Sequence, residues 1–261
     1  MERIEDLLLE RVIPAGKAKR PPLLFVHGMW GGSWYWANYL NAAAEAGWEA
    51  WAINLRGHHG SRPIPDLGRV SVLDYVQDVL DCLRRLGEVV LIGHSMGGLI
   101  AQKVAEAGGV RVAVALTSAA PRGIVALRWA VLSRMVKYLG PIIRSRAFTS
   151  SRADADALVL NQLSPDRQAW AYDRLVPESG RAARELAFGL IGVDEARVRC
   201  PLLVVGAERD AITPAAVQRR IGRKYAADYR EMVGHGHMLM LEEEWERPFQ
   251  QILEWVESRT R

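Results

Sequence analysis

LIGHSMGGLIAQKVAE, residues 91–106, joins the end of a short apolar run to the beginning of an amphipathic helical pattern. Ser95 stands at the junction, and Gly93 and Gly97 flank it in the pattern G-x-S-x-G. Where a strand turns directly into a helix, glycines allow close packing and the strained turn exposes the serine hydroxyl. The alternative is a glycine-rich helix start with a capping serine. We predict a serine nucleophile here, with the backbone N–H of Met96 pointing into the site from the helix N-terminus.

The rest of the chain alternates short apolar runs with helical patterns. Several runs are apolar on both faces, as a parallel sheet covered by helices requires. The candidate strands are residues 21–28, 48–57, 88–95, 110–121, 200–210 and 227–237. Between two of them, residues 71–87 form an amphipathic pattern with Ser71 and Asp74 as a capping box and Gly87 as the stop. This order predicts an α/β fold with a mostly parallel, doubly wound sheet.

One segment interrupts the alternation. From residue 122 to residue 194 no strand-like run occurs, while residues 124–140 and 153–163 have the period of a helix. We therefore predict an α/β core formed by residues 1–121 and 195–261, and a helical cap, residues 122–194, inserted between two strands.

Composition limits the classes of function. The formal net charge of +4 comes from arginines scattered along the chain, so we expect neither a nucleic acid nor a membrane as partner. Cys82 and Cys200 lie far apart, which supports neither a disulfide framework nor a zinc ribbon. No apolar run approaches the roughly 18 residues of a membrane span, and the N-terminus lacks the pattern of a secretory signal, so the expected location is cytoplasmic.

A serine needs a base to activate it and an acid to orient that base. In an open α/β sheet, catalytic groups gather at the carboxyl ends of the strands, and the chain order is serine, acid, histidine. The fifth candidate strand ends in Glu208 and Asp210, and the sixth ends in His235 and His237. The sequence therefore offers Glu208 and Asp210 as candidates for the acid, and His235 and His237 as candidates for the base.

From about residue 21 onward, apart from the cap, the sequence resembles the α/β-hydrolase fold superfamily. The pieces that carry the resemblance are FVHGMWGG, NLRGHHGS, GHSMGG, GAERDAITP and GHMLMLE. The resemblance implies Asp210 as the acid, because the superfamily's acid motif falls on Gly206, Asp210 and Pro214. It implies His237 as the base, because Gly236 precedes it and Glu242 follows at the expected offset.

The same resemblance assigns the remaining polar groups. After His27 and Gly28, the N–H of Met29 is expected to form the oxyanion hole together with that of Met96. We expect His235 to be a hydrogen-bonded neighbour of the site, and His58 and His59 to have structural roles. His235 and His237 lack further ligands of metal-binding type, so we expect no metal and no cofactor.

The predicted activity is that of a carboxylesterase that cleaves short- to medium-chain acyl esters or lactones through an acyl-enzyme. Aromatic side chains near the oxyanion loop and in the cap are the expected substrate contacts, unless they form the core of the cap. They are Trp30, Trp129, Tyr138 and Trp170. The superfamily also includes cofactor-free haloperoxidases, hydrolase-like small-molecule receptors and hydroxynitrile lyases. A lyase would need a lysine near the base, and Lys137 is the one lysine of the cap sequence.

Overall fold

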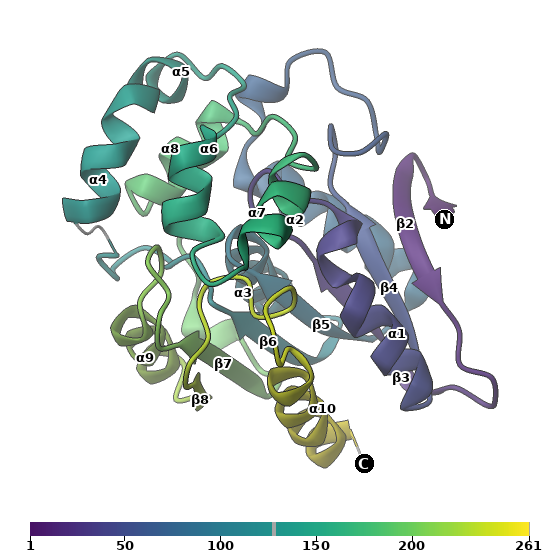
Figure 1. The fold of residues 1–261 in the computed structure, drawn as a ribbon. Helices are drawn as coiled ribbons and strands as arrows, with labels where there is room; N and C mark the ends of the chain where they lie inside the picture. Colours follow the sequence, from purple (N-terminus) through teal and green to yellow (C-terminus); the bar gives the residue numbers. More distant parts are fainter. Residues whose placement is uncertain (127–128, 261) are drawn as a thin grey trace.

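The computed structural model describes residues 1–126 and 129–260. Its centre is an eight-stranded sheet with the strand order β1-β2-β4-β3-β5-β6-β7-β8 (Figure 1). The strands are β1 Glu2–Ile4, β2 Leu7–Val12, β3 Lys19–Val26, β4 Trp48–Asn54, β5 Val89–His94, β6 Val110–Leu116, β7 Leu202–Ala207 and β8 Asp228–Met232. The pairs β1–β2 and β2–β4 are antiparallel, and all the other neighbours are parallel. The predicted mostly parallel α/β sheet is confirmed.

Helices cover both faces of this sheet. On β3, Leu23 and Phe25 pack with α1 and α10, whereas Leu24 and Val26, which point the other way, pack with α2, α3 and α9. These helices are α1 Ala37–Glu45, α2 Val72–Leu86, α3 Met96–Ala107, α9 Ala215–Lys224 and α10 Glu246–Thr260. Two apolar layers therefore hold the strands rigidly between them, and the carboxyl ends of the parallel strands form a fixed platform.

Helix α2 shows how local sequence sets these boundaries. Ser71 accepts a hydrogen bond from the N–H of Leu73 at 3.1 Å, and Asp74 accepts one from the N–H of Ser71 at 2.8 Å. Gly87 ends the helix with a φ of 76°, a conformation that favours glycine. The predicted capping box and stop are confirmed.

The N-terminal hairpin β1–β2 is an element that the sequence analysis does not predict. Leu7 and Leu9 of β2 are buried under α2, while the intervening side chains are only partly covered. Arg11 joins the hairpin to β4, because its guanidinium lies 2.8 Å from Glu49 and 4.6 Å from the centre of the Trp51 ring. A short, half-exposed edge strand buries too few side chains to give a clear apolar pattern.

Residues 122–194, called the insertion below, connect β6 to β7. Their described part is helical, with α4 Trp129–Met135, α5 Leu139–Ile143, α6 Arg152–Asp154, α7 Pro165–Tyr172 and α8 Gly180–Ala187. A 3₁₀ turn, Val136–Tyr138, joins α4 to α5, and a single β-bridge pairs Phe148 with Glu178. None of the helices in the described ranges has the length and apolar composition needed to cross a bilayer.

The insertion lies over the carboxyl edge of the sheet (Figure 1). Hydrogen bonds anchor it to loops that follow different strands. Trp30, after β3, donates from its indole N–H to Phe148 O at 3.2 Å. Asn161 donates to Arg209 O, after β7, at 3.0 Å, and Arg167 donates to Leu241 O, after β8, at 3.0 Å.

Candidate active site

Ser95 lies on the turn between β5 and α3. Its backbone has φ 54° and ψ −117°, a conformation that L-residues with side chains rarely adopt, and its side chain is partly exposed. A Cβ on Gly93 would lie 1.9 Å from Gly97 O, and one on Gly97 would lie 2.3 Å from Val26 O. The turn can therefore form only where both flanking positions lack a side chain, as the G-x-S-x-G pattern predicts.

Asp210 and His237 meet at the same edge of the sheet. Asp210 follows β7 and His237 follows β8, and Asp210 Oδ2 lies 2.8 Å from His237 Nδ1, with both side chains buried. The N–H of Thr213 donates to Asp210 Oδ1 at 2.8 Å, and the Thr213 hydroxyl donates to Oδ2 at 2.7 Å. Burial raises the pKa of the Asp210 carboxyl, but His237 and the bonds from Thr213 outweigh it, so the pKa lies below its ordinary value. The carboxylate is thus ionised at neutral pH.

His94 connects the serine turn to the histidine loop. Its Nε2 lies 3.0 Å from His237 O, which also accepts a hydrogen bond from the Thr117 hydroxyl at 3.2 Å. Burial lowers the pKa of His94 well below its ordinary value, so the ring is neutral and its single N–H is at Nε2. Within residues 1–126 and 129–260 no hydrogen bond joins the Ser95 hydroxyl to His237. Such contacts are often long in free enzymes and tighten when substrate binds.

Glu242 organises the loop that carries His237. Its Oε2 accepts hydrogen bonds from the N–H of Gly236 at 2.8 Å and from His235 Nδ1 at 3.1 Å, and its Oε1 accepts one from the N–H of Met238 at 3.1 Å. The carboxylate therefore fixes the backbone on both sides of His237. His235 is a hydrogen-bonded neighbour, as expected.

The loop after β3 lies beside Ser95. A Cβ on Gly28 would come within 2.9 Å of Ser95 Cβ, so Gly28 packs directly against the serine and Met29 follows it. His27 holds this loop: its Nδ1–H donates to Gly28 O at 2.7 Å, and its Nε2 accepts from the N–H of Leu55 at 3.2 Å. Met96 is the first residue of α3. Met29 and Met96, whose N–H groups are the predicted oxyanion donors, thus directly follow Gly28 and Ser95, two residues that pack against each other.

The four aromatic residues expected to contact substrate are not gathered in one place. Trp30 and Tyr138 are buried and both pack against Phe148, with ring centroids 5.8 and 5.4 Å away. Trp170 is partly buried and packs edge-on against Trp34 at 5.3 Å. Trp129 is 80% exposed at the start of α4. A substrate contact by any of them stays a prediction, and the burial of Trp30 and Tyr138 shows that they also form core.

A buried ion pair escapes the sequence analysis. Glu178, from the insertion, has Oε2 3.2 Å from His58 Nε2, and its Oε1 accepts hydrogen bonds from the Tyr75 hydroxyl at 2.5 Å and the N–H of Ser179 at 2.6 Å. Burial opposes both charges, but their mutual attraction prevails. The pKa of Glu178 lies below its ordinary value and that of His58 above its own. His58 is structural, as expected, but no local pattern around Glu178 identifies its partner.

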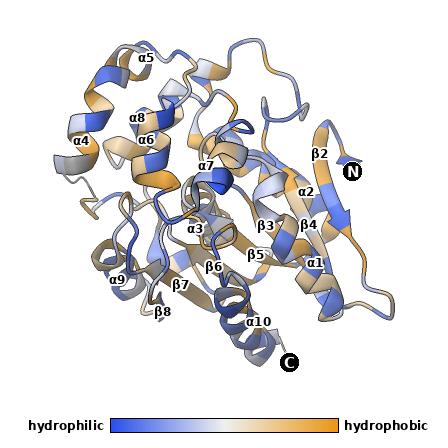
Figure 2. Cartoon of the chain, viewed as in Figure 1, coloured by the Kyte–Doolittle hydropathy of each residue, from blue (hydrophilic) through white to orange (hydrophobic). Residues whose placement is uncertain are grey.

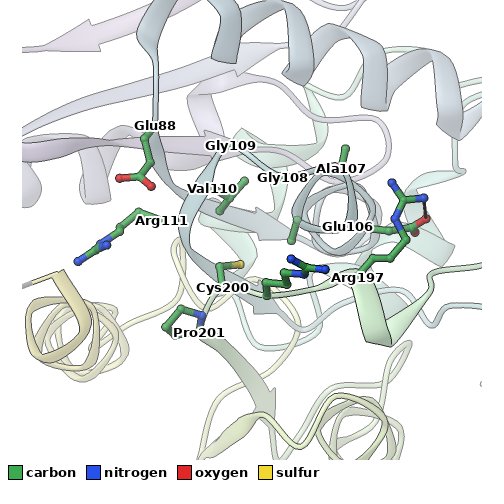
Figure 3. A pocket seen from close by; sticks show the side chains of 12 residues that line it. Glu88, Glu106, Ala107, Gly108, Gly109, Val110, Arg111, Arg197, Cys200 and Pro201 are labelled. Carbon is green, nitrogen blue, oxygen red and sulfur yellow. Dashed lines mark ion pairs between the residues drawn. The ribbon is translucent and has the colours of Figure 1, made fainter.

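The remaining sequence candidates lie elsewhere. Lys137 is exposed and pairs with Asp154, whose Oδ2 is 2.5 Å from the ammonium nitrogen. Across the described ranges, no group of three or more His, Cys, Asp or Glu side chains is arranged to hold a metal ion. A hollow of about 460 Å³ lies at the amino ends of β6 and β7, at the opposite edge of the sheet from Ser95. Arg111, labelled in Figure 3, lines it together with Arg199. It contains none of the predicted site residues.

Known proteins share both the sequence pattern and the architecture. Over 85 residues the chain is 32% identical to a carbendazim hydrolyzing esterase of Nocardioides sp. (strain SG-4G), a match that covers 32% of this chain and 35% of that protein. The chain spans only about a third of the length of such curated relatives.

Two solved structures match almost throughout. The monoacylglycerol lipase of Paleococcus ferrophilus has a TM-score of 0.74 at 22% identity, with 97% of this chain and 99% of that one covered. A thermophilic esterase of Thermogutta terrifontis has a TM-score of 0.75 at 20% identity, with 98% and 94% covered. At these identities the likeness concerns the fold. The sequence pattern of the alpha/beta hydrolase family, however, matches residues 23–254. The chain therefore belongs to the alpha/beta hydrolase family.

Proposed function

We propose that the protein is a carboxylesterase in which Ser95, His237 and Asp210 form a catalytic triad. His237 takes the proton of the Ser95 hydroxyl through Nε2 as the oxygen attacks the ester carbonyl. The alcohol leaves with that proton, and an acyl-enzyme forms on Ser95. Water, deprotonated by His237, then attacks the acyl group, and release of the acid regenerates the serine.

The ionised Asp210 has two tasks in this mechanism. Its bond to His237 Nδ1 keeps the proton on that nitrogen and leaves Nε2 free to accept one. Its negative charge stabilises the imidazolium that forms during each attack. The backbone N–H groups of Met29 and Met96 are proposed to bind the oxyanion, and the N-terminus of α3 adds a favourable field there.

The proposed substrates are short- to medium-chain acyl esters or lactones. The chemistry of the triad is the same for both, because a lactone is a cyclic ester. Support for an ester substrate comes from the similarity to the carbendazim hydrolyzing esterase.

One observation carries the proposal: a buried His237–Asp210 pair, 2.8 Å apart, shares the sheet edge with a serine held at φ 54° on a strand-to-helix turn. The test is labelling with a fluorophosphonate, followed by mass spectrometry of the peptides. We expect one equivalent on Ser95. We also expect Ser95→Ala to abolish both labelling and hydrolysis of a chromogenic ester, with a loss on the order of 10⁶ in kcat.

Ser118 provides the matched control. It is a second serine at the same edge, after β6, and its hydroxyl accepts a hydrogen bond from Gln102 at 2.8 Å. Ser118→Ala should keep both labelling and turnover, provided that circular dichroism shows a folded protein. A folded Ser95→Ala variant that retained a tenth of the activity, or a label on another residue, would refute the proposal.

A further inference from the structure

The outer side of α4 and α5 carries a stripe of exposed apolar side chains. Its members recur at intervals of three and four residues, so they share one side of the continuous helical turns from α4 to α5. They are Trp129 (80% exposed), Leu132 (38%), Val136 (54%), Leu139 (39%) and Ile143 (63%). We call these five residues the apolar stripe.

A neighbouring side of the same turns is anchored in the core. Tyr138 and Ile142 are buried, and Val131 and Met135 pack against the same apolar cluster. The apolar stripe is therefore a second apolar face, separate from the one that holds the helix in place. In Figure 1, α4 lies at the outermost corner of the insertion, and Figure 2 shows apolar and polar residues alternating along it.

Positive charge accompanies the stripe. Residues 129–152 include Arg134, Lys137, Arg144, Arg146 and Arg152, and no aspartate or glutamate. Asp154 pairs with Arg134 and Lys137, and Asp156 pairs with Arg152. Arg144 and Arg146 are exposed and form no ion pair within the described part of the chain.

This combination favours one occupant. A helix with aliphatic residues and a tryptophan on one side and lysine or arginine beside them is typical of segments that lie in the interface of an anionic bilayer. A second copy of the chain is disfavoured, because symmetric pairing of the stripes would bring two basic segments together. We propose that the apolar stripe, with Arg144 and Arg146, docks the insertion onto an anionic lipid surface.

The proposal concerns binding and does not depend on the esterase activity. It revises the expectation of no membrane partner, which followed from arginines that are scattered in the sequence. The fold exposes five apolar side chains on one helical segment, and two arginines without an ion pair in the described ranges, Arg144 and Arg146, follow in the same stretch of chain. Docking there would turn the insertion, and the sheet edge beneath it, toward the lipid.

Flotation with vesicles tests the proposal. We expect the full chain to float with vesicles of phosphatidylcholine containing phosphatidylglycerol and to stay behind with phosphatidylcholine alone. Binding should weaken in high salt, because salt screens the exposed arginines. Trp129 fluorescence should shift to shorter wavelength on binding, and Trp129→Phe should remove that shift.

Two pairs of double variants test whether lipid binding depends on the apolar stripe and its arginines, or only on the overall hydrophobicity and net charge of the protein. Val136→Ser with Ile143→Ser removes apolar surface from the stripe, and Leu73→Ser with Ile13→Ser removes similar exposed groups elsewhere. Arg144→Glu with Arg146→Glu changes the net charge of the basic segment. Arg111→Glu with Arg199→Glu changes the net charge by the same amount, but at the hollow at the opposite edge of the sheet. Each basic residue near the surface contributes about fivefold to binding, so the first charge pair should lose at least about 25-fold.

The result that supports the proposal is loss of flotation in the two stripe variants and retention in their controls. Equal loss in both charge pairs would show a response to net charge and overturn it. Absence of flotation by the wild type would overturn the proposal as well. Binding to polyglutamate would then point to an acidic protein partner. Sedimentation as a dimer that Val136→Ser with Ile143→Ser dissociates would instead point to a second copy of the chain.

Discussion

His235 and His237 stand two residues apart, yet their partners differ. Asp210 holds the ring of His237, whereas Glu242 holds that of His235. If His237 is the base, His237→Ala should remove nearly all turnover, by a factor on the order of 10⁶ in kcat. His235→Ala loses a hydrogen bond of about 1 kcal/mol and should keep turnover within roughly tenfold. Both variants are compared on one chromogenic ester, with folding checked by circular dichroism.

The opposite order of activities would reassign the base. Asp210→Asn adds a further check, because it preserves shape but makes Nδ1 accept a hydrogen bond where it should donate one, which places the ring proton on Nε2. We expect a loss of about 10⁴ in kcat with an unchanged melting temperature to within a few degrees. A variant that kept normal turnover would show that Asp210 does not orient the base.

For single residues, the sequence predicts a role correctly where that role depends on residues nearby in the chain. Ser95, with its two glycines, is identified because the strained turn is a local structure. Glu242 is located by its offset, but its actual work, three hydrogen bonds around His237, is not visible there. Glu178 is missed because its partner, His58, is 120 residues away and only the tertiary fold joins them.

The pair of Glu178 and His58 connects two elements, the insertion and the loop after β4, and its contribution to stability depends on pH. The pKa of Glu178 is depressed, so its contribution is present above its ordinary value of 4.5 and is lost as pH falls through the folded pKa. The pKa of His58 is raised, so its contribution is present below its ordinary value of 6.5 and is lost as pH rises through the folded pKa. Both contributions are complete between these two values.

We therefore expect Glu178→Gln to destabilise the protein most between pH 4.5 and 6.5, by about 3 kcal/mol, since it leaves a buried charge without its partner. The difference from wild type should shrink as the pH rises above the folded pKa of His58. Urea unfolding at a series of pH values measures it, and Glu243→Gln, an exposed acid, is the control. A pH-independent difference would show that His58 is neutral in the folded state.

Elements were predictable to the extent that they bury a continuous face. Five of the six parallel strands, β3 to β7, and α2 have strong apolar patterns, and the structure contains all of them, whereas β8 buries only Met232 completely. The helices α7 and α8 of the insertion are not predicted individually, because each has only eight residues and neither buries a large apolar side chain completely. In α7 only Ala171 is fully buried, so polar side chains dominate its period.

At the scale of the whole molecule, the insertion and the sheet share one apolar cluster. Leu160 and Phe148 of the insertion belong to the same cluster as Phe25 of β3 and Val114 of β6. We expect Leu160→Ala, at a fully buried position, to cost about 3 kcal/mol and to lower the melting temperature of the entire protein by roughly 6–12 °C. Far-ultraviolet circular dichroism and tryptophan fluorescence should report a single coincident transition.

An early transition confined to part of the signal would contradict this expectation. It would mean that residues 122–194 unfold on their own, as a separate cap. Leu132→Ala serves as the control, because this leucine belongs to the same insertion but is 38% exposed and should change the melting temperature little.

The glycines around Ser95 affect how a random mutant library should be interpreted. Any side chain at Gly93 or Gly97 would overlap backbone atoms, so clones with substitutions there should fail in a screen because they do not fold. Position 95 differs, because alanine or glycine fits the same turn. Inactive clones at positions 93 and 97 therefore say nothing about chemistry, whereas an abundant, folded and inactive clone at position 95 does.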